Sequence, residues 1–430
     1  RGAATMRTTK TLMAGLILLG AAGLVQAETA WSTQDYDLYP GDFNGDGLTD
    51  LLYVARDTRH LNGIALSDGS GFNTPLQSWG NAYLGIPWSD GTYRILVADF
   101  NGDGKDDLFL QRSTPGDHYV LLTEDGGIGA ISQSLPNDAA GLDWSGKAHR
   151  LVAGDFDGDG RADLFLQAND AEGLNAVLTA DAEGLFTAAE PLQSWKDGYA
   201  GFDWAVTEAQ VFAADFNGDG HDDLLLQAEP LPGTGPGTTT PAAFAPNMNG
   251  VVLAGKAPFA TEGVQAWSRD GFKAEWSPLA SAITTADFNG DGRSDVLLQG
   301  QSATDASFLL YGRSQGPIFE SASALEVGSL PAAQDYALLA GSYGGKSASL
   351  YAQARSPAGS NLLASLTPSA GGTTVVTTLK DAVGVRRRRR RSRERRTRRG
   401  RPLALLLANT PGRTPGQFAV SPMGAATYQT

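Results

Sequence analysis

An acidic nine-residue motif that recurs five times constrains the fold of this chain more than any other feature. The motif reads D-F-[ND]-G-D-G-x-x-D, and mainly apolar residues follow each copy. The copies begin at Asp42, Asp99, Asp155, Asp215 and Asp287, so that successive copies are 57, 56, 60 and 72 residues apart. Repeats of this length indicate one structural unit each, stacked on its neighbours to bury a shared core.

Tryptophans keep the same register as the motif. One lies eleven residues before the first aspartate of every copy: Trp31, Trp88, Trp144, Trp204 and Trp276. A second precedes it by nine residues at Trp79, Trp195 and Trp267, and Leu135 takes that place in one unit. A sixth unit, GSYGGKSASLYAQ from Gly341, follows the pattern with Ser342 and Ser349 in place of the first and last aspartates. We expect this unit to keep its strands without a metal.

Each unit contains four strand-like segments. In the second unit they are residues 93–98, 108–111, 119–123 and 129–135. Matching third segments occur in the other units at residues 63–66, 175–178, 250–253, 307–311 and 361–365. The pattern predicts an all-β protein, a β-propeller of six or seven four-stranded blades with calcium-binding loops. The alternative is a linear β-solenoid, whose rungs are usually much shorter.

The motif has the ligand spacing of a calcium-binding loop. Calcium takes about six to eight oxygen ligands, and alternate residues of a tight loop point inward. Positions 1, 3 and 5 would supply side-chain oxygens, position 7 a backbone carbonyl and position 9 a last carboxylate, while glycine at position 6 permits the sharp turn. The alternative, an Asx-rich turn without metal, would crowd three or four carboxylates together without compensating charge.

We therefore predict about five bound calcium ions with a structural role. The predicted ligands are Asp42, Asn44, Asp46, Leu48 and Asp50 in the first loop; Asp99, Asn101, Asp103, Lys105 and Asp107 in the second; Asp155, Asp157, Asp159, Arg161 and Asp163 in the third; Asp215, Asn217, Asp219, His221 and Asp223 in the fourth; and Asp287, Asn289, Asp291, Arg293 and Asp295 in the fifth.

The loops differ from EF-hands, because no glutamate stands at position 12 and strand-like residues follow instead of a helix. In these respects residues 31–383 resemble the FG-GAP/VCBS repeat family. The resemblance implies an integrin-alpha-like β-propeller, calcium at the blade edges, and a role in cell adhesion or as an exported scaffold. Integrin-like heads have seven blades, whereas six units are countable here.

The charge distribution argues against a nucleic-acid partner. Twelve arginines and one glutamate fall within residues 386–401, a net charge of +11; since the whole chain carries −14, the rest carries −25. An acidic body repels nucleic acid, and the arginine run lacks aromatic residues for stacking on bases. The chain has no cysteine, and its four histidines (His60, His118, His149 and His221) share no repeat position. No catalytic motif is present, so we expect no enzymatic activity.

The chain divides into four parts. Residues 6–27 have the pattern of a signal peptide, which predicts a bacterial protein that is secreted or held at the cell surface. Residues 28–383 form the propeller, and 384–414 a basic low-complexity linker. Residues 415–430, PGQFAVSPMGAATYQT, resemble the start of the shell region of Rhs and toxin-complex B-subunit proteins, here truncated.

Two further segments bear on the architecture. The Pro-, Gly- and Thr-rich stretch from Pro230 predicts a long disordered surface loop inside the fourth unit. No segment of the mature chain is long enough to form a transmembrane helix.

These patterns predict a calcium-binding adhesion or protein-docking scaffold whose partner is an unidentified protein or glycan at the cell surface. The resemblance of the last residues would make it the N-terminal part of a Rhs-like exported protein. Two alternatives remain open. The paired tryptophans either pack blade against blade or form lectin-type sugar pockets, and the many carboxylates would also allow a polysaccharide-active enzyme on the same scaffold.

Overall fold

The computed structural model describes residues 31–69, 71–187, 190–229, 248–255, 259–268, 270–319, 325–326, 330–343, 348–357, 359–368, 374–376, 380–381, 418–420 and 426–428. The predicted signal peptide (6–27), the linker (384–414) and most of the predicted surface loop (231–247) lie outside these residues.

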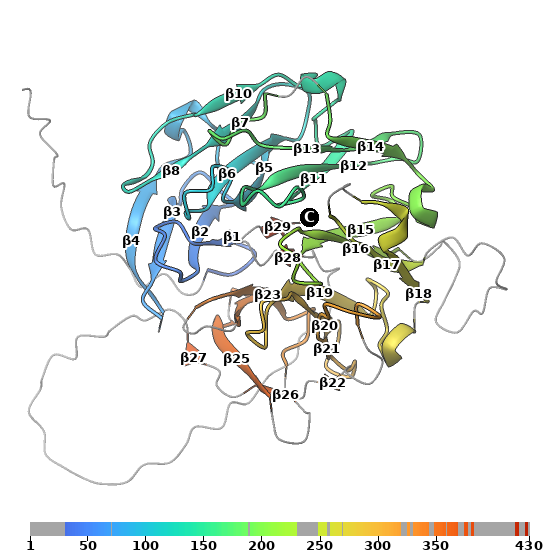
Figure 1. Ribbon diagram of the computed structural model, residues 1–430. Helices are drawn as coiled ribbons and strands as arrows, with labels where there is room; N and C mark the ends of the chain where they lie inside the picture. The colour runs from blue at the N-terminus through green and yellow to red at the C-terminus, as the bar shows by residue number, and fades with distance from the viewer. Residues whose placement is uncertain are drawn as a thin grey trace, which may run out of the picture.

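Six antiparallel sheets of consecutive strands surround a central axis, each running from an inner to an outer strand (Figure 1). The inner strands are β1 (Tyr36–Gly41), β5 (Tyr93–Ala98), β11 (His149–Gly154), β15 (Ala209–Ala214), β19 (Ser281–Ala286) and β23 (Tyr336–Gly341). The second strands are β2 (Asp50–Ala55), β6 (Asp107–Arg112), β12 (Asp163–Ala168), β16 (Asp223–Ala228), β20 (Asp295–Gly300) and β24 (Ser349–Ala354).

The third strands are β3 (Asn62–Ser67), β7 (His118–Leu121), β13 (Leu174–Leu178), β17 (Asn249–Val252), β21 (Phe308–Leu310) and β25 (Leu362–Pro368). The outer strands are β4 (Phe72–Trp79), β10 (Gln133–Leu135), β14 (Gln193–Lys196), β18 (Val264–Trp267), β22 (Leu325–Glu326) and β26 (Thr374–Val376). All pairings within a blade are antiparallel. The predicted β-propeller with four strands per blade is therefore confirmed.

The core is divided into six apolar clusters, one between each pair of neighbouring blades. One cluster joins Leu96 of blade 2 to Leu151 of blade 3, and another joins Leu38 of blade 1 to Leu339 of blade 6. A radial sheet has a neighbouring blade on both faces, which explains why second strands such as β12 are buried along their whole length and carry a continuous apolar run. Each repeat therefore buries its core only with its neighbours.

The last blade packs directly on the first, which closes the ring at six blades rather than seven. The N–H of Thr33, ahead of β1, donates to the carbonyl of Ala354 at the end of β24 at 2.9 Å. The side chain of Gln353 donates to the carbonyls of Trp31 and Tyr36, both at 3.0 Å. Of the six or seven blades predicted, the structure has six, and the degenerate unit forms blade 6.

Short elements complete the described residues. Five single-turn 3-10 helices occur: η1 (Tyr83–Gly85), η2 (Ala139–Gly141), η3 (Tyr199–Gly201), η4 (Thr261–Gly263) and η5 (Gly271–Lys273). Blade 2 carries an added hairpin of β8 (Thr123–Glu124) and β9 (Gly127–Ile128), and β27 (Lys380–Asp381) pairs with β25. Among the described residues, no helix is long and apolar enough to cross a membrane.

A hairpin from the end of the chain reaches the propeller axis. It consists of β28 (Phe418–Val420) and β29 (Ala426–Tyr428), and β29 pairs with β5 at Leu96 and Val97 (Figure 1). These are the described residues of the segment that resembles the start of a Rhs-type shell.

Candidate metal centres

All five motifs form the hairpin loop between the inner and second strands of their blades. In blade 2 the last inner residue, Ala98, pairs with Asp107, which starts the second strand and is position 9 of the motif. The same register places Gly41 opposite Asp50 in blade 1. Because every inner strand runs in the same direction, the five loops lie at one end of the propeller.

The aspartate at position 1 organises each loop around its own carboxylate. In blade 2 the N–H of Gly102 donates to Oδ1 of Asp99 at 2.7 Å, and the N–H of Gly104 donates to Oδ2 at 2.8 Å. Both glycines have left-handed backbones, with φ of 73° and 83°. A side chain would strain both positions, so the loop requires glycine at position 4 as well as at position 6.

Positions 3 and 5 lie beside that carboxylate. In blade 4 the N–H of Asp219 donates to Oδ1 of Asn217 at 2.7 Å, and Nδ2 of Asn217 donates to Oδ2 of Asp219 at 3.1 Å. In blade 3, where position 3 is an aspartate, carboxylate oxygens of Asp155, Asp157 and Asp159 all lie within 4.8 Å of one another. The sequence-predicted side-chain ligands at positions 1, 3 and 5 therefore come together.

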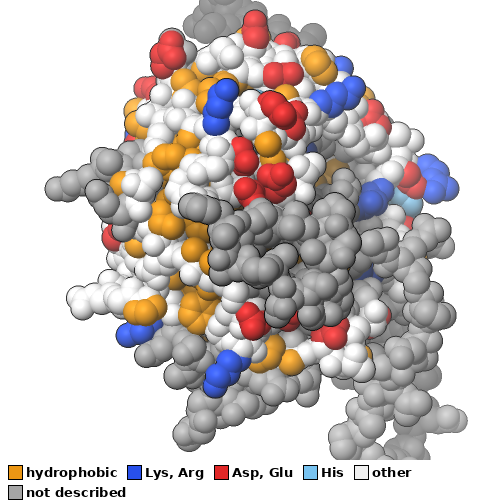
Figure 2. Space-filling view, turned by 90° about the vertical axis from the view of Figure 1, so that its right-hand side faces the viewer, with side chains coloured by type: hydrophobic (Ala, Val, Ile, Leu, Met, Phe, Trp, Pro, Cys, Tyr) orange, Lys and Arg blue, Asp and Glu red, His pale blue; other side chains and the backbone are white. Residues whose placement is uncertain are grey.

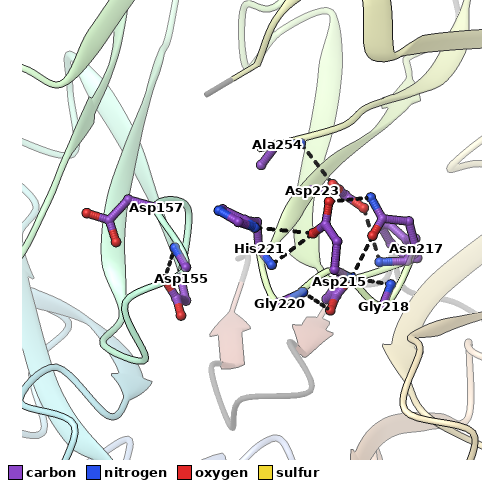
Figure 3. Close-up of polar contacts among 12 residues, drawn as sticks. Asp155, Asp157, Asp215, Asn217, Gly218, Gly220, His221, Asp223 and Ala254 are labelled. Carbon is purple, nitrogen blue, oxygen red and sulfur yellow. Dashed lines mark hydrogen bonds and ion pairs between the residues drawn. The ribbon is translucent and has the colours of Figure 1, made fainter. Parts of the chain in front are cut away.

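The aspartate at position 9 is fully buried and fastens the loop to the blade. In blade 4, Oδ2 of Asp223 accepts the N–H of Phe216 at 3.1 Å, and Oδ1 accepts the N–H of Ala254 at 2.9 Å (Figure 3). Burial raises the pKa of these position-9 aspartates, to about 7 for Asp50 and to about 8 for Asp107, Asp163 and Asp295. The other aspartates of each loop raise it further, and a bound cation would oppose both effects.

The donor set suits a hard cation such as calcium. It consists of carboxylate and amide oxygens on a glycine-rich turn, without sulfur or imidazole at the inward positions. The carboxylate at position 9 is fully buried and lies near the other aspartates of its loop, so a bound positive charge would lower the cost of its ionisation. At position 7 the N–H donates to the position-5 carboxylate, for example from Lys105 to Asp103 at 2.9 Å. Carbonyl ligation by Leu48, Lys105, Arg161, His221 and Arg293 stays a prediction.

Basic side chains at position 7 lie between neighbouring loops. Nδ1 of His221 is 3.3 Å from Oδ1 of Asp219 in its own loop, and its ring packs over Gly158 of blade 3. Figure 3 shows His221 between the Asp155–Asp157 loop and the Asp215 loop. Arg161 and Arg293 likewise pair with the position-5 aspartates of their own loops. The two arginines lower the cost of placing five acidic loops at one end.

Position 8 links the loops into a ring, a role that the sequence reasoning missed. The N–H at position 8 donates to the position-1 carbonyl of the preceding blade: Asp106 to Asp42 at 2.8 Å, Ala162 to Asp99 at 2.8 Å, Asp222 to Asp155 at 2.6 Å and Ser294 to Asp215 at 2.7 Å. Ala348 donates to Asp287 at 2.9 Å, and Thr49 donates to Ser342 at 3.1 Å. The sequence carries little indication of this role, because the contact is made by the backbone at position 8 and the residue type there varies.

A glutamine four residues after position 9 forms a second link between blades. The side chain of Gln167 donates to the carbonyls of Trp204 and Ala209, at 2.7 and 2.9 Å. Gln111, Gln227, Gln299 and Gln353 make the same pair of contacts with the next blade. Blade 1 has Val54 at this position. The repeated glutamine was visible in the sequence without an assigned role.

The paired tryptophans lie inside the interfaces between blades. Trp144, Trp204 and Trp276 are 0% exposed, and Trp79 and Trp195 are 5% exposed. Trp195 stacks on Phe165 with ring centroids 5.3 Å apart, and it meets Trp204 edge to face at 5.1 Å. Rings buried in this way pack blade against blade, so they do not present faces for a sugar to stack on.

A second acidic group lies outside the five loops. Carboxylate oxygens of Asp197, Asp203 and Glu208 lie within 4.8 Å of one another at the junction of blades 3 and 4. Oδ1 of Asp197 accepts the N–H of Trp204, which fixes the turn before β15. Burial and the charges of Asp197 and Asp203 raise the pKa of Glu208.

Comparisons with known proteins agree with this architecture. FG-GAP-like repeats match residues 33–110 and 155–226. Phosphatidylinositol-glycan-specific phospholipase D of Rattus norvegicus is 29% identical over 182 residues, covering 37% of this chain; the chain spans only 21% of that relative's length.

Among solved structures, an Agrocybe aegerita lectin described as recognising non-reducing terminal N-acetylglucosamine has a TM-score of 0.51 at 17% identity, covering 82% of this chain and 81% of the lectin. A putative 6-phosphogluconolactonase from Bacteroides uniformis has a TM-score of 0.43 at 12% identity, covering 80% and 83%. At such identities the lectin shows a shared fold alone. The matched repeats and the closed ring of six blades together make this chain an FG-GAP-like repeat protein with a six-bladed β-propeller.

Proposed function

We propose that this chain is an exported, calcium-loaded propeller that serves as a non-catalytic binding scaffold for a protein or glycan at the cell surface. The observation that carries the proposal is the set of five loops at one end, in which the position-1 aspartate is wrapped by the turn and the position-9 aspartate is fully buried; in blade 3 the carboxylates of positions 1, 3 and 5 also come together. Export is supported by the signal-peptide pattern of residues 6–27. A reporter fused behind these residues would be cleaved and leave the cytoplasm.

Calcium in this proposal stabilises the scaffold rather than taking part in a reaction. An ion held only by the folded loop favours the folded state by mass action. Since the position-8 contacts join each loop to its neighbour, ordering one loop supports the next. On the face shown in Figure 2, acidic and basic side chains are scattered among apolar ones. Outside residues 386–401 the chain carries a net charge of −25, which favours cations and disfavours nucleic acid.

The binding role is tested with the full-length protein in calcium and in EGTA. We would measure binding to a glycan array that includes N-acetylglucosamine-terminated glycans, the group named for the lectin of similar fold, and to intact bacterial cells. Calcium-dependent binding to cells, with no polysaccharide cleavage, is the expected result. If the protein in calcium binds neither the glycan array nor the cells, the scaffold proposal is rejected.

A matched pair of variants separates the loops from general charge effects. Asp103→Asn removes a predicted ligand with little change of shape, whereas Asp117→Asn removes an exposed carboxylate outside the loops. We expect weaker calcium-dependent binding for Asp103→Asn and no change for Asp117→Asn. Equal effects of both variants would remove the loops from the explanation.

A further inference from the structure

The axis of the propeller holds the hairpin formed by β28 and β29. Strand β29 lies beside the inner strands β1, β5 and β11, and strand β28 lies beside the inner strands β15, β19 and β23 (Figure 1). The hairpin therefore has blades 1–3 on one side and blades 4–6 on the other. Each half of the ring meets a different strand of the hairpin.

The hairpin joins the sheet of blade 2 through one inner strand. The strand order there is β6, β5, β29 and β28, with hydrogen bonds between neighbours. In the antiparallel register Val97 lies opposite Ala426, and Leu96 lies opposite Thr427. Within the hairpin, Ala426 lies opposite Val420, so Val97, Ala426 and Val420 form one row across three strands. Without the hairpin, β5 would be an edge strand with unpaired N–H and C=O groups along the axis.

Two other inner strands are less suited to take an added strand. In β1, Pro40 has the place that Val97 has in β5, two residues before the first aspartate of the loop, and proline has no N–H to donate. In β15, the carbonyl of Val211 already accepts a hydrogen bond from Nη2 of Arg150 at 2.8 Å. Strand β5 contains no proline. These differences favour β5 over β1 and β15 as the edge to which a strand is added.

We propose that the axial edge of β5 is a strand-docking site, and that the chain's own hairpin of β28 and β29 occupies it as an internal plug. Strand addition gains affinity from main-chain hydrogen bonds, and a segment of the same chain docks at a high effective concentration. Because the hairpin lies against both halves of the ring, docking ties blades 1–3 to blades 4–6. It also covers an edge that would otherwise pair with another molecule. The proposal is independent of the calcium loops and of any external partner.

Engineered disulfides test the docking, because the chain has no cysteine of its own. The pair Val97→Cys and Ala426→Cys places two thiols on neighbouring strands, with Cα atoms about 5 Å apart and within reach of a disulfide. The pair Leu96→Cys and Thr427→Cys tests the adjacent register, since successive positions alternate between the two kinds of antiparallel pair. The matched control is Val97→Cys with Val420→Cys, whose Cα atoms are two strands and about 10 Å apart, too far for a disulfide.

The full-length variants are oxidised in saturating calcium and analysed by non-reducing electrophoresis and peptide mass mapping. Melting of the single-cysteine variants verifies that each one folds. We expect an intramolecular disulfide in at least one of the two register pairs, and little in the control pair. Failure of both register pairs, an equal yield in the control, or a disulfide that joins two molecules would overturn the proposal.

Hydrogen exchange gives a second measurement that leaves β5 unaltered. Thr427→Pro removes a main-chain donor from β29 and disfavours its pairing, whereas Thr427→Ala keeps the N–H and is the matched control. The amides of β5 at Leu96 and Val97 are followed in the full-length protein in calcium. We expect exchange about 10-fold faster or more at one of them in Thr427→Pro, and no change in Thr427→Ala. Unchanged protection of β5 in Thr427→Pro would likewise contradict the plug.

Discussion

Replacing Gln167 by leucine tests whether the glutamine links hold the blades together. Gln167 is 0% exposed and donates to two carbonyls of the next blade, at 2.7 and 2.9 Å. Leucine has a similar size but cannot donate, so two hydrogen bonds are lost and two buried carbonyls lose a partner. At about 1 to 2 kcal/mol for each bond, the variant should lose about 2–4 kcal/mol of stability.

The assay is scanning calorimetry of the full-length protein in saturating calcium, where a loss of this size lowers the melting temperature by several degrees. Gln34→Leu is the control, because Gln34 also bonds across a blade interface, to the carbonyl of Arg355 at 3.2 Å, but is exposed. Its effect should stay within about 0.5 kcal/mol. Equal melting temperatures for the two variants would refute the argument that the buried glutamines join the blades.

Three further predictions concern the loops and the core. Without metal, the raised pKa values of the position-9 aspartates, about 7 to 8, mean that the folded protein holds more protons than the unfolded chain between about pH 4 and 8. In EGTA the melting temperature should therefore fall as pH rises through this range, and a rise would contradict the assignment. Gly104→Ala should lower the free energy of unfolding by about 1–2 kcal/mol, because Gly104 has a φ of 83°. Gly80→Ala should be neutral, because Gly80 has open space around it and no positive φ. Denaturant titration of both variants measures the difference. Trp144→Ala, fully buried, should cost about 3–5 kcal/mol in the same titration, whereas Leu279→Ala, 71% exposed, should change little.

The strands were predictable because each repeat carries a continuous apolar run next to a fixed turn. Residues 93–98 were predicted as a strand, and β5 has those bounds. The predicted third strand at 175–178 corresponds to β13, which begins one residue earlier. The number of blades in the closed ring was not predictable in the same way, because rings of six and of seven similar units differ only in how the last blade packs on the first. The contacts of Gln353 with Trp31 and Tyr36 resolve this, and they join residues more than 300 positions apart.

The candidate site was predictable where side chains act and less so where the backbone acts. Spacing indicated that Asp155, Asp157 and Asp159 would meet, and their oxygens do. The spacing did not show that Asp163 would be buried and would accept the N–H of Ala180, just after the third strand, at 3.0 Å. The hydrogen bonds that link position 8 to the preceding blade use main-chain N–H groups, so they impose no residue preference that a sequence could show.

Counting calcium ions on the full-length protein tests the central claim most directly. Calorimetric titration of metal-free protein, with melting in calcium and in EGTA, should give five ions, one for each intact loop, and a large rise in melting temperature. Asp103→Asn should lower the count to four, while blade 6 should bind none. No bound calcium, or a melting temperature that EGTA leaves unchanged, would contradict the account and make the loops hairpin turns without metal.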